Sequence, residues 1–167
     1  MIRGLKHKMV IKGILDEDFV NYKKCSMYIA FPYCTFKCDK ENGCQLCQNM
    51  ELTRSPNITI EAEELVKRYL DNPLTHSVVM CGLEPLDSFT DVVNFIHLLR
   101  HKYNCIDDIV IYTGYNKEEI TEYISILKKY NNIIIKYGRF RPNQKSRYDE
   151  VLGVTLVSDN QYAEKIS

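Results

Sequence analysis

Short apolar runs without polar interruption recur along this chain, and they constrain its fold more than any other feature. Each is rich in Val, Ile and Tyr and lacks the polar–apolar alternation of a strand with one exposed face. Uninterrupted runs of this kind are typical of parallel sheets, which are covered on both faces. The runs are Ser26–Phe31, Ser77–Cys81, Ile109–Tyr112, Ile133–Lys136 and Val154–Val157, and Met9–Leu15 is a candidate edge strand.

Amphipathic segments lie between these runs, and three of them carry a helix start signal. The first opens after Thr59, the second after Ser88, and the third at Asn116 with Glu119 in the capping-box position. Strand–helix–strand repetition predicts parallel strands joined by right-handed crossovers. Because no linker divides the sequence, we expect one α/β domain over residues 1–167.

Four of the seven cysteines, Cys34, Cys38, Cys44 and Cys47, lie within fourteen residues of one another. The odd total argues against a framework of disulfides. The apolar run Met9–Ile11 is too short for a secretory signal, and no stretch reaches the roughly 18 apolar residues of a membrane span. We therefore expect a cytoplasmic protein with reduced thiols and a metal site in the cysteine loop.

Two kinds of metal site suit these thiols. As zinc ligands all four form a C-x3-C-x5-C-x2-C set, although the gap between Cys38 and Cys44 is short for paired knuckles. As iron ligands, three thiolates hold three irons of a [4Fe–4S] cluster and leave the fourth iron open to a substrate or cofactor. Cys34 and Cys38 are then the natural first two ligands, and spacing alone does not choose between Cys44 and Cys47.

Three unusual loops follow successive predicted strands. The cysteine loop begins at Pro32, Cys81–Pro85 follows the second strand, and Thr113–Tyr115 follows the third. The carboxyl ends of parallel strands meet at one edge of a sheet, where ligand sites of such folds lie. The topology therefore predicts one functional site built from these three loops.

Charge gives little sign of a polyanionic partner. The formal net charge is zero and the sequence pI is near 6.9, so there is no general attraction to nucleic acid. The basic residues near the C-terminal end are interpreted as a solvated loop, with a docking surface or a contact to a ligand carboxylate as alternatives. They are Lys136, Arg139, Arg141, Lys145 and Arg147.

The cysteine loop resembles that of the radical S-adenosylmethionine (SAM) enzymes, and most closely that of the activating proteins of anaerobic ribonucleoside-triphosphate reductases. Cys34 and Cys38, with aromatic residues before and between them, match the first part of the family's C-x3-C-x2-C loop. The segment Cys47–Asn49 matches its ending, after an insertion of six residues. On this resemblance Cys47 is the third ligand and Cys44 is a spare thiol in the insertion.

Further segments resemble the same family in the same order. Gly82–Pro85 is similar to its Gly-Gly-Glu-Pro loop, with Leu83 interposed, and Thr113–Tyr115 is similar to its Thr-Gly-Tyr loop. Tyr137–Phe140 resembles its Asp-Gly-Arg-Phe segment without the acid, and Ser158–Gln161 resembles its Ser-Ser-Asn-Gln. The resemblance implies an incomplete (β/α) barrel with a [4Fe–4S] cluster on Cys34, Cys38 and Cys47. The residues that it implies for SAM binding are Leu46, Gln48, Asn49, Gly82, Glu84 and Thr113.

The resemblance also implies an activity. The cluster would cleave SAM reductively, and the resulting radical would take hydrogen from a backbone glycine of the reductase large subunit. An electron donor such as flavodoxin or ferredoxin would be a second partner, with no nucleic acid and no membrane involved. Activation of another glycyl-radical enzyme, a small-molecule radical SAM reaction, and a non-catalytic zinc-binding interaction module remain alternatives.

Overall fold

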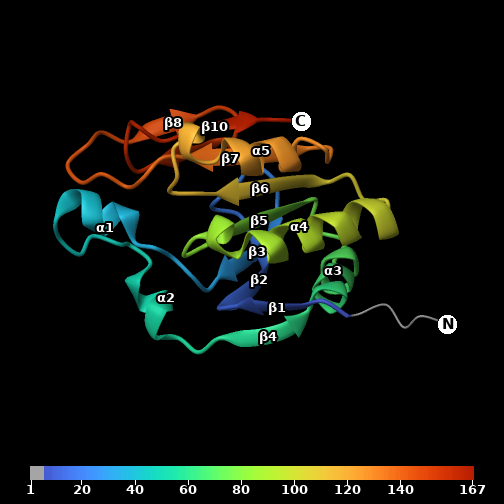
Figure 1. Ribbon diagram of the computed structural model, residues 1–167. Helices are drawn as coiled ribbons and strands as arrows, with labels where there is room; N and C mark the ends of the chain where they lie inside the picture. The colour runs from blue at the N-terminus through green and yellow to red at the C-terminus, as the bar shows by residue number, and fades with distance from the viewer. Residues whose placement is uncertain (1–5) are drawn as a thin grey trace.

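The computed structural model describes residues 6–167, whose centre is a six-stranded sheet (Figure 1). The strands are β1 (Lys8–Ile11), β2 (Gly13–Asp18), β3 (Ser26–Phe31), β4 (Ile58–Glu61), β5 (Ser77–Gly82), β6 (Asp108–Tyr112), β7 (Ile133–Tyr137), β8 (Arg147–Asp149), β9 (Val154–Leu156) and β10 (Tyr162–Lys165). The helices are α1 (Lys37–Asn42), α2 (Met50–Arg54), α3 (Ala62–Leu70), α4 (Phe89–His97) and α5 (Thr121–Leu127), with short turns η1 (Pro85–Ser88), η2 (Leu98–Lys102) and η3 (Lys117–Glu119). Residues 1–5 lie outside the described residues. The expectation that the chain has no secretory signal rests partly on them.

The central sheet has the strand order β10-β7-β6-β5-β3-β2. Its four inner strands, β3, β5, β6 and β7, pair in parallel, while β2 and β10 are antiparallel edges. This arrangement confirms the α/β class and a mostly parallel sheet. The incomplete barrel stays a prediction, because the pairing establishes only an ordered row of strands.

Two predicted strands differ from the structure. The run Val154–Val157 is not a fifth parallel strand, because β9 pairs only with β8 in a separate hairpin. Its residues alternate, with Thr155 exposed and Leu156 buried, so the hairpin covers the sheet with one face. The run Met9–Leu15 divides at Lys12, so that β1 pairs with β4 and only β2 forms the sheet edge.

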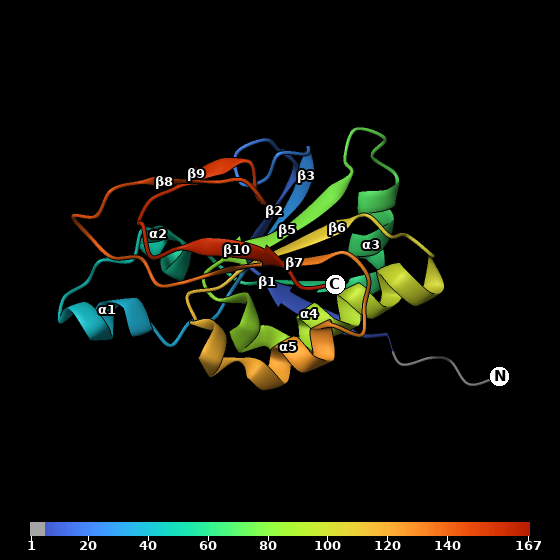
Figure 2. The same ribbon diagram turned by 90° about the horizontal axis from the view of Figure 1, so that it is seen from above.

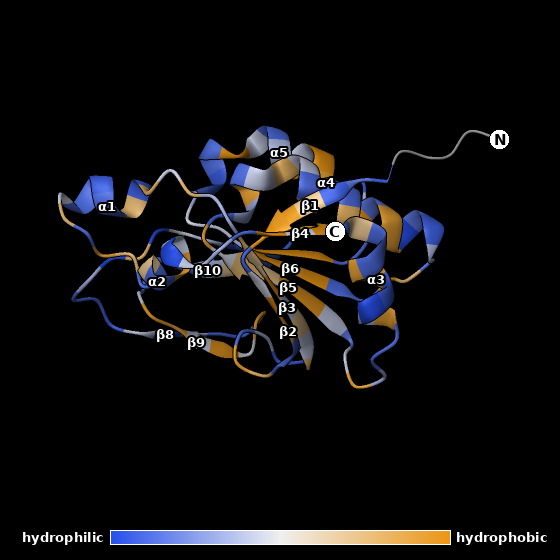
Figure 3. Ribbon diagram, turned by 90° about the horizontal axis from the view of Figure 1, so that it is seen from below, coloured by the Kyte–Doolittle hydropathy of each residue, from blue (hydrophilic) through white to orange (hydrophobic). Residues whose placement is uncertain are grey.

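The faces of the sheet carry different layers. Buried side chains of α3, α4 and α5 pack on the face that presents Met80, Ile111 and Ile135. The opposite face, which presents Val79 and Val110, packs against the segment around β9. Figure 2 shows α4 and α5 on one side of the sheet and the β8–β9 hairpin on the other, and Figure 3 shows the apolar strands between them. Burial on both faces explains why the strand sequences lack alternation.

Helix starts were predicted with mixed success. The capping box is present, since the Asn116 backbone N–H donates to Glu119 Oε2 at 2.8 Å, and it opens η3 just before α5. Helix α4 follows Ser88 as expected. Helix α3 begins at Ala62 rather than directly after Thr59, because Ile58–Glu61 is taken up by β4. None of the helices in residues 6–167 has both the length and the apolar character that crossing a membrane requires.

Candidate metal centre

The loops that follow β3, β5 and β6 meet at the carboxyl edge of the sheet, as the topology predicts. The Gly114 backbone N–H, after β6, donates to Glu84 Oε2, after β5, at 2.8 Å. A Cβ atom added at Gly114 would lie 3.7 Å from Cys38 Sγ and 3.6 Å from Glu84 Oε2. Residue 114 therefore brings a bare backbone between a predicted cluster ligand and the buried acid. Figure 1 shows α1 and α2, which belong to the cysteine loop, beyond this end of the sheet.

One small cavity opens between these loops. It is lined by Cys34, Thr35, Lys37, Cys38, Glu84, Gly114, Tyr115 and Arg139. Two of the predicted cluster ligands and one predicted SAM contact thus face the same space. The arrangement places soft sulfur donors, which suit zinc and iron–sulfur clusters, beside a carboxylate that can accept a hydrogen bond from a cationic ligand.

The thiols of the cysteine loop are chemically suited to a thiolate-bound centre. All seven cysteines are free. Burial raises the pKa of Cys34 to about 12, and it also raises the pKa of Cys47. The nearby charge of Cys38 makes a smaller contribution to both pKa values. A bound cation reverses the effect of burial, because it stabilises the thiolates.

Within residues 6–167, no three His, Cys, Asp or Glu side chains form a complete ligand set. Cys44, the fourth thiol of the loop, is exposed. Its exposure agrees with the expectation of a spare thiol, and the choice between Cys44 and Cys47 stays a prediction.

Glu84 is the buried acid of the site. It is 5% exposed, and its carboxylate accepts hydrogen bonds from the backbone N–H groups of Leu86 at 3.1 Å and of Gly114 at 2.8 Å. Burial raises its pKa to about 7, against the opposing effect of these hydrogen bonds. Near neutral pH this group can therefore either hold a proton or accept a hydrogen bond from a cationic amine.

The end of the cysteine loop is tied to the loop after β5. Asn49 Nδ2 donates to the Gly82 carbonyl oxygen at 2.7 Å. Gly82 has φ +88°, and a Cβ there would lie 2.6 Å from the Phe31 backbone nitrogen. Only glycine fits this position, because a side chain would be both strained and in collision with β3.

The remaining predicted SAM contacts are spread around the site. Thr113 is buried, and its hydroxyl accepts from the Tyr115 backbone N–H at 3.0 Å, which fixes the turn that presents Gly114. The Leu46 backbone N–H donates to Asp39 Oδ1 at 2.8 Å. Gln48 is exposed. Leu46 and Gln48 thus lie in the cysteine loop without lining the cavity, and their contact with SAM stays a prediction.

Two further residues organise the site: Asp87, which sequence reasoning missed, and Arg139, which it named only in the basic run and in the segment Tyr137–Phe140. Asp87, in η1, accepts from the Thr35 backbone N–H at 2.9 Å and from the Tyr115 hydroxyl at 2.5 Å, so it connects all three loops. Arg139 lines the cavity and its side chain is 4% exposed. The Asp87 connection depends on which loops meet in space, and no local sequence pattern contains that information.

The interpretation of the basic run as a solvated loop is wrong for two of its members. Lys136 and Arg139 are 7% and 4% exposed, because both lie at the end of the inner strand β7. Burial lowers the pKa of Lys136 to about 8. Arg141, Lys145 and Arg147 are exposed, as a solvated loop requires.

Comparisons with known proteins agree with the metal assignment. Residues 23–161 match the family model described as a 4Fe-4S single cluster domain. The chain is also 25% identical over 157 residues to the probable dual-specificity RNA methyltransferase RlmN of Malacoplasma penetrans (strain HF-2). That alignment covers 85% of this chain but only 44% of the relative, so the chain spans less than half the length of the curated protein it matches. No solved structure matches the chain.

These two matches support the radical SAM superfamily to which the loop motifs point. The family model includes the cysteine loop, the loops after β5 and β6, and the segment after β7, so every part of the described site lies inside the matched range. The chain belongs to the 4Fe-4S single cluster domain family.

Proposed function

We propose that this protein is a cytoplasmic radical SAM activase that generates a glycyl radical on the large subunit of an anaerobic ribonucleoside-triphosphate reductase. The observation that carries the proposal is the meeting of Cys38, Glu84 and Gly114 at one sheet edge. A cluster ligand, a buried carboxylate and a bare backbone are the three features that a cluster-bound amino acid moiety needs in one place.

Different residues of the chain would bind the cluster and SAM. Cys34, Cys38 and Cys47 would hold the cluster, and Glu84 would accept a hydrogen bond from the SAM amino group. When bound, the cluster supplies the electron for SAM cleavage, which is chemistry of the cofactor and not of the protein. Asn49 holds the Gly82 carbonyl in place, and Thr113 fixes the turn before Gly114. The protein thus orients the cofactors on short, mutually bonded loops.

A protein substrate suits the open end of the sheet. The cluster loop and α1 lie at the rim of the molecule in Figure 1 and Figure 2, with the hairpin β8–β9 covering a different face. A reductase loop that carries a glycine would complete the enclosure on binding and exclude water. An electron donor such as flavodoxin or ferredoxin would supply the reducing electron.

The direct test uses the protein purified without oxygen and mixed with the reductase large subunit, SAM and a reductant. We expect a visible absorption band that bleaches with dithionite, release of methionine, and the electron paramagnetic resonance signal of a glycyl radical on the large subunit. Replacing the acceptor glycine of the large subunit by alanine is the control that should abolish only the radical signal. A colourless protein that binds zinc through all four loop thiols would contradict the proposal.

RNA methyl transfer is a second candidate, because the curated relative carries that description. Under that candidate, methyl groups from labelled SAM appear in RNA. Under the activase proposal they stay in methionine. The same labelled SAM therefore separates the two candidates in parallel reactions.

A further inference from the structure

Arg139 lies between two carboxylates that come from different parts of the chain. Its Nη2 donates to Glu119 Oε1 at 2.6 Å, and its Nε lies 3.0 Å from Glu41 Oε1. Glu119 belongs to η3, next to the sheet, whereas Glu41 belongs to α1 in the inserted part of the cysteine loop. One guanidinium therefore joins the insertion to the body of the fold.

The other end of α1 is held through the same acid. Lys37, the first residue of α1, places Nζ 3.1 Å from Glu119 Oε1 and 4.6 Å from the centre of the Tyr115 ring. The Asn116 backbone N–H binds Glu119 Oε2 at 2.8 Å, which fixes this acid at its capping position. The hydrogen bond from Arg139 is the main cause that lowers the pKa of Glu119 to about 2, so the acid stays charged.

Helix α1 has little else to hold it. It has six residues, none of them buried, and Phe36 before it has φ +52° and provides no side-chain cap. A helix of this length is not stable by itself in water. Ion pairs at exposed sites contribute little. The Arg139 side chain, however, is 4% exposed, donates a hydrogen bond to Glu119 and forms an ion pair with Glu41, so its contacts are stronger. The position of α1 thus depends on the Arg139 contacts.

Cys38 is the second residue of this helix. We propose that Arg139 is a positioning residue that holds α1, through Glu41 and Glu119, and thereby fixes Cys38 in place as a cluster ligand. The effect on the cluster rests on the proposed ligand role of Cys38, whereas the effect on α1 does not. Cys47 lies beyond the insertion, and Cys34 precedes α1, so neither belongs to the helix that Arg139 holds.

The first test measures backbone hydrogen exchange of residues 37–42 in the cluster-free protein. Glu41→Gln and Arg139→Gln should each speed this exchange by about tenfold, because each removes a charge-assisted contact of α1. Exposed neighbours provide matched controls, Glu51→Gln for the acid and Arg141→Gln for the base, and neither should change it. Unchanged exchange in Glu41→Gln, which alters only an exposed side chain and leaves the core intact, overturns the proposal.

The second test follows loss of the visible cluster band after addition of a chelator. Glu41→Gln and Arg139→Gln should each shorten the lifetime of the cluster several-fold, and the double variant should be no worse than Arg139→Gln alone, because both act through one contact. Arg139→Lys should recover only part of the lifetime, since an ammonium cannot bridge two carboxylates as a planar guanidinium does.

If hydrogen exchange of α1 becomes faster but the cluster lifetime does not change, then holding α1 does not help Cys38 to bind the cluster, and that part of the proposal is overturned. Additive losses in the double variant overturn the shared contact. If the unaltered protein binds no cluster, the ligand role of Cys38 fails instead, and the exchange data from the cluster-free protein still decide whether Arg139 positions α1.

Discussion

At the scale of single residues, the site combines groups that a folded protein stabilises poorly unless a ligand is bound. The carboxylate of Glu84 is buried, and the hydrogen bonds that it accepts come from two backbone N–H groups and not from a charged side chain. The thiols of Cys34 and Cys47 are likewise held in their neutral form by burial. Such groups are common at functional sites, where a bound cation later repays their desolvation.

The buried Glu84 predicts a pH dependence of stability in the cluster-free protein. Its pKa is raised to about 7 in the folded protein, against about 4.3 when unfolded. Between these values the folded state holds a proton that the unfolded state releases, so stability falls as pH rises through this window and then levels off. The contribution lost is roughly 4 kcal/mol. Urea unfolding of the wild-type protein and Glu84→Gln at a series of pH values measures it.

Glu84→Gln should remove this part of the slope, because the amide does not titrate and its oxygen can still accept a backbone hydrogen bond. Glu122→Gln, at an exposed position of α5, is the control and should keep the wild-type slope. A slope that is the same in Glu84→Gln and in the wild-type protein would show that Glu84 titrates normally.

Replacing Cys47 and replacing Cys44, the two candidates for the third cluster ligand, should have opposite effects on the cluster. Cys47→Ala should lose the visible cluster band after anaerobic reconstitution, because a three-thiolate cluster does not tolerate loss of a ligand. Cys44→Ala should keep it at close to the wild-type iron content, since Cys44 is exposed. Iron and sulfide analysis of both variants decides the assignment, and a colourless Cys44→Ala protein would reverse it.

Cysteine spacing and motif order were enough to predict Cys34, Cys38 and Glu84 as neighbours, because the loops that carry them follow recognisable strands. Arg139 appeared as one of several basic residues of a loop. Its burial follows from the pairing of the edge strand β10 with β7 and from Asn160, whose Nδ2 donates to the Arg139 carbonyl at 2.9 Å. A single sequence does not contain these long-range contacts in any local form.

At the scale of elements, the ends of β3 and β5 pack closely against each other. Phe31 pairs with Gly82 in the parallel register, and the cysteine loop starts one residue after Phe31. The close backbone approach at Gly82 therefore sets the direction in which that loop leaves the sheet.

Gly82→Ala should disturb both strand ends. Its Cβ would lie 2.6 Å from the Phe31 nitrogen at a backbone with φ +88°, so we expect a loss of at least about 2 kcal/mol of stability. The iron content should fall as well, because the start of the cysteine loop shifts. Gly13→Ala is a matched control in β2, where a Cβ would meet no atom within 4 Å. Equal unfolding midpoints for the two variants in urea would contradict this account.

Long apolar runs predicted the inner strands to within a residue, because burial on both faces leaves a strong sequence signal. The short elements β4, β8, β10, α1 and α2 were not predicted. Each has at most six residues, and their positions depend on tertiary contacts more than on local propensity. The one local signal for α1 was Gly43, which has φ +67° and ends the helix as a glycine commonly does.

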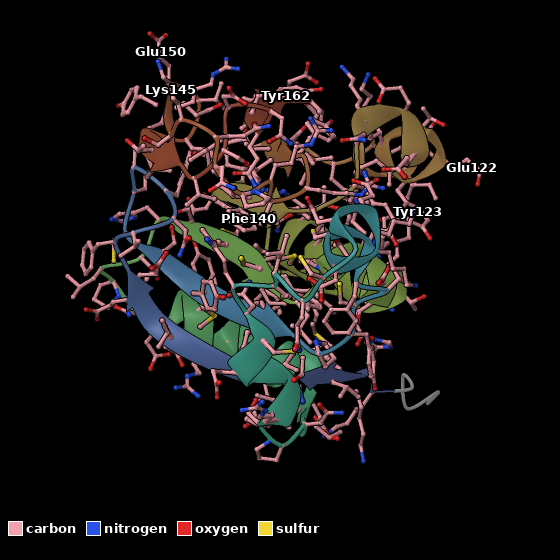
Figure 4. The ribbon with its side chains drawn as sticks, turned by 90° about the vertical axis from the view of Figure 1, so that its left-hand side faces the viewer. Glu122, Tyr123, Phe140, Lys145, Glu150 and Tyr162 are labelled. Atoms are coloured by element: carbon pink, nitrogen blue, oxygen red, sulfur yellow. The ribbon has the colours of Figure 1, made fainter. Side chains whose placement is uncertain are left out.

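At the scale of the whole molecule, charge separates the proposed activase from an RNA-modifying enzyme. The chain has 22 basic and 22 acidic residues. Two members of the basic run are buried at the site, and the exposed Lys145 lies at the same rim as Glu150 in the view of Figure 4. An RNA-binding face needs several unpaired cations that together contact phosphates.

We therefore predict weak binding to RNA. Fluorescence anisotropy with labelled transfer RNA or a ribosomal RNA fragment should give no dissociation constant tighter than about 100 μM at physiological salt. Lowering the salt tenfold is the internal control, because residual electrostatic binding should strengthen only slightly when few phosphates are contacted. Micromolar binding with a steep salt dependence would show that several phosphates are neutralised. Together with methyl transfer from SAM to the RNA, it would favour the RNA methyltransferase candidate. Weak binding would argue against RNA as the substrate and would be consistent with the proposed activase.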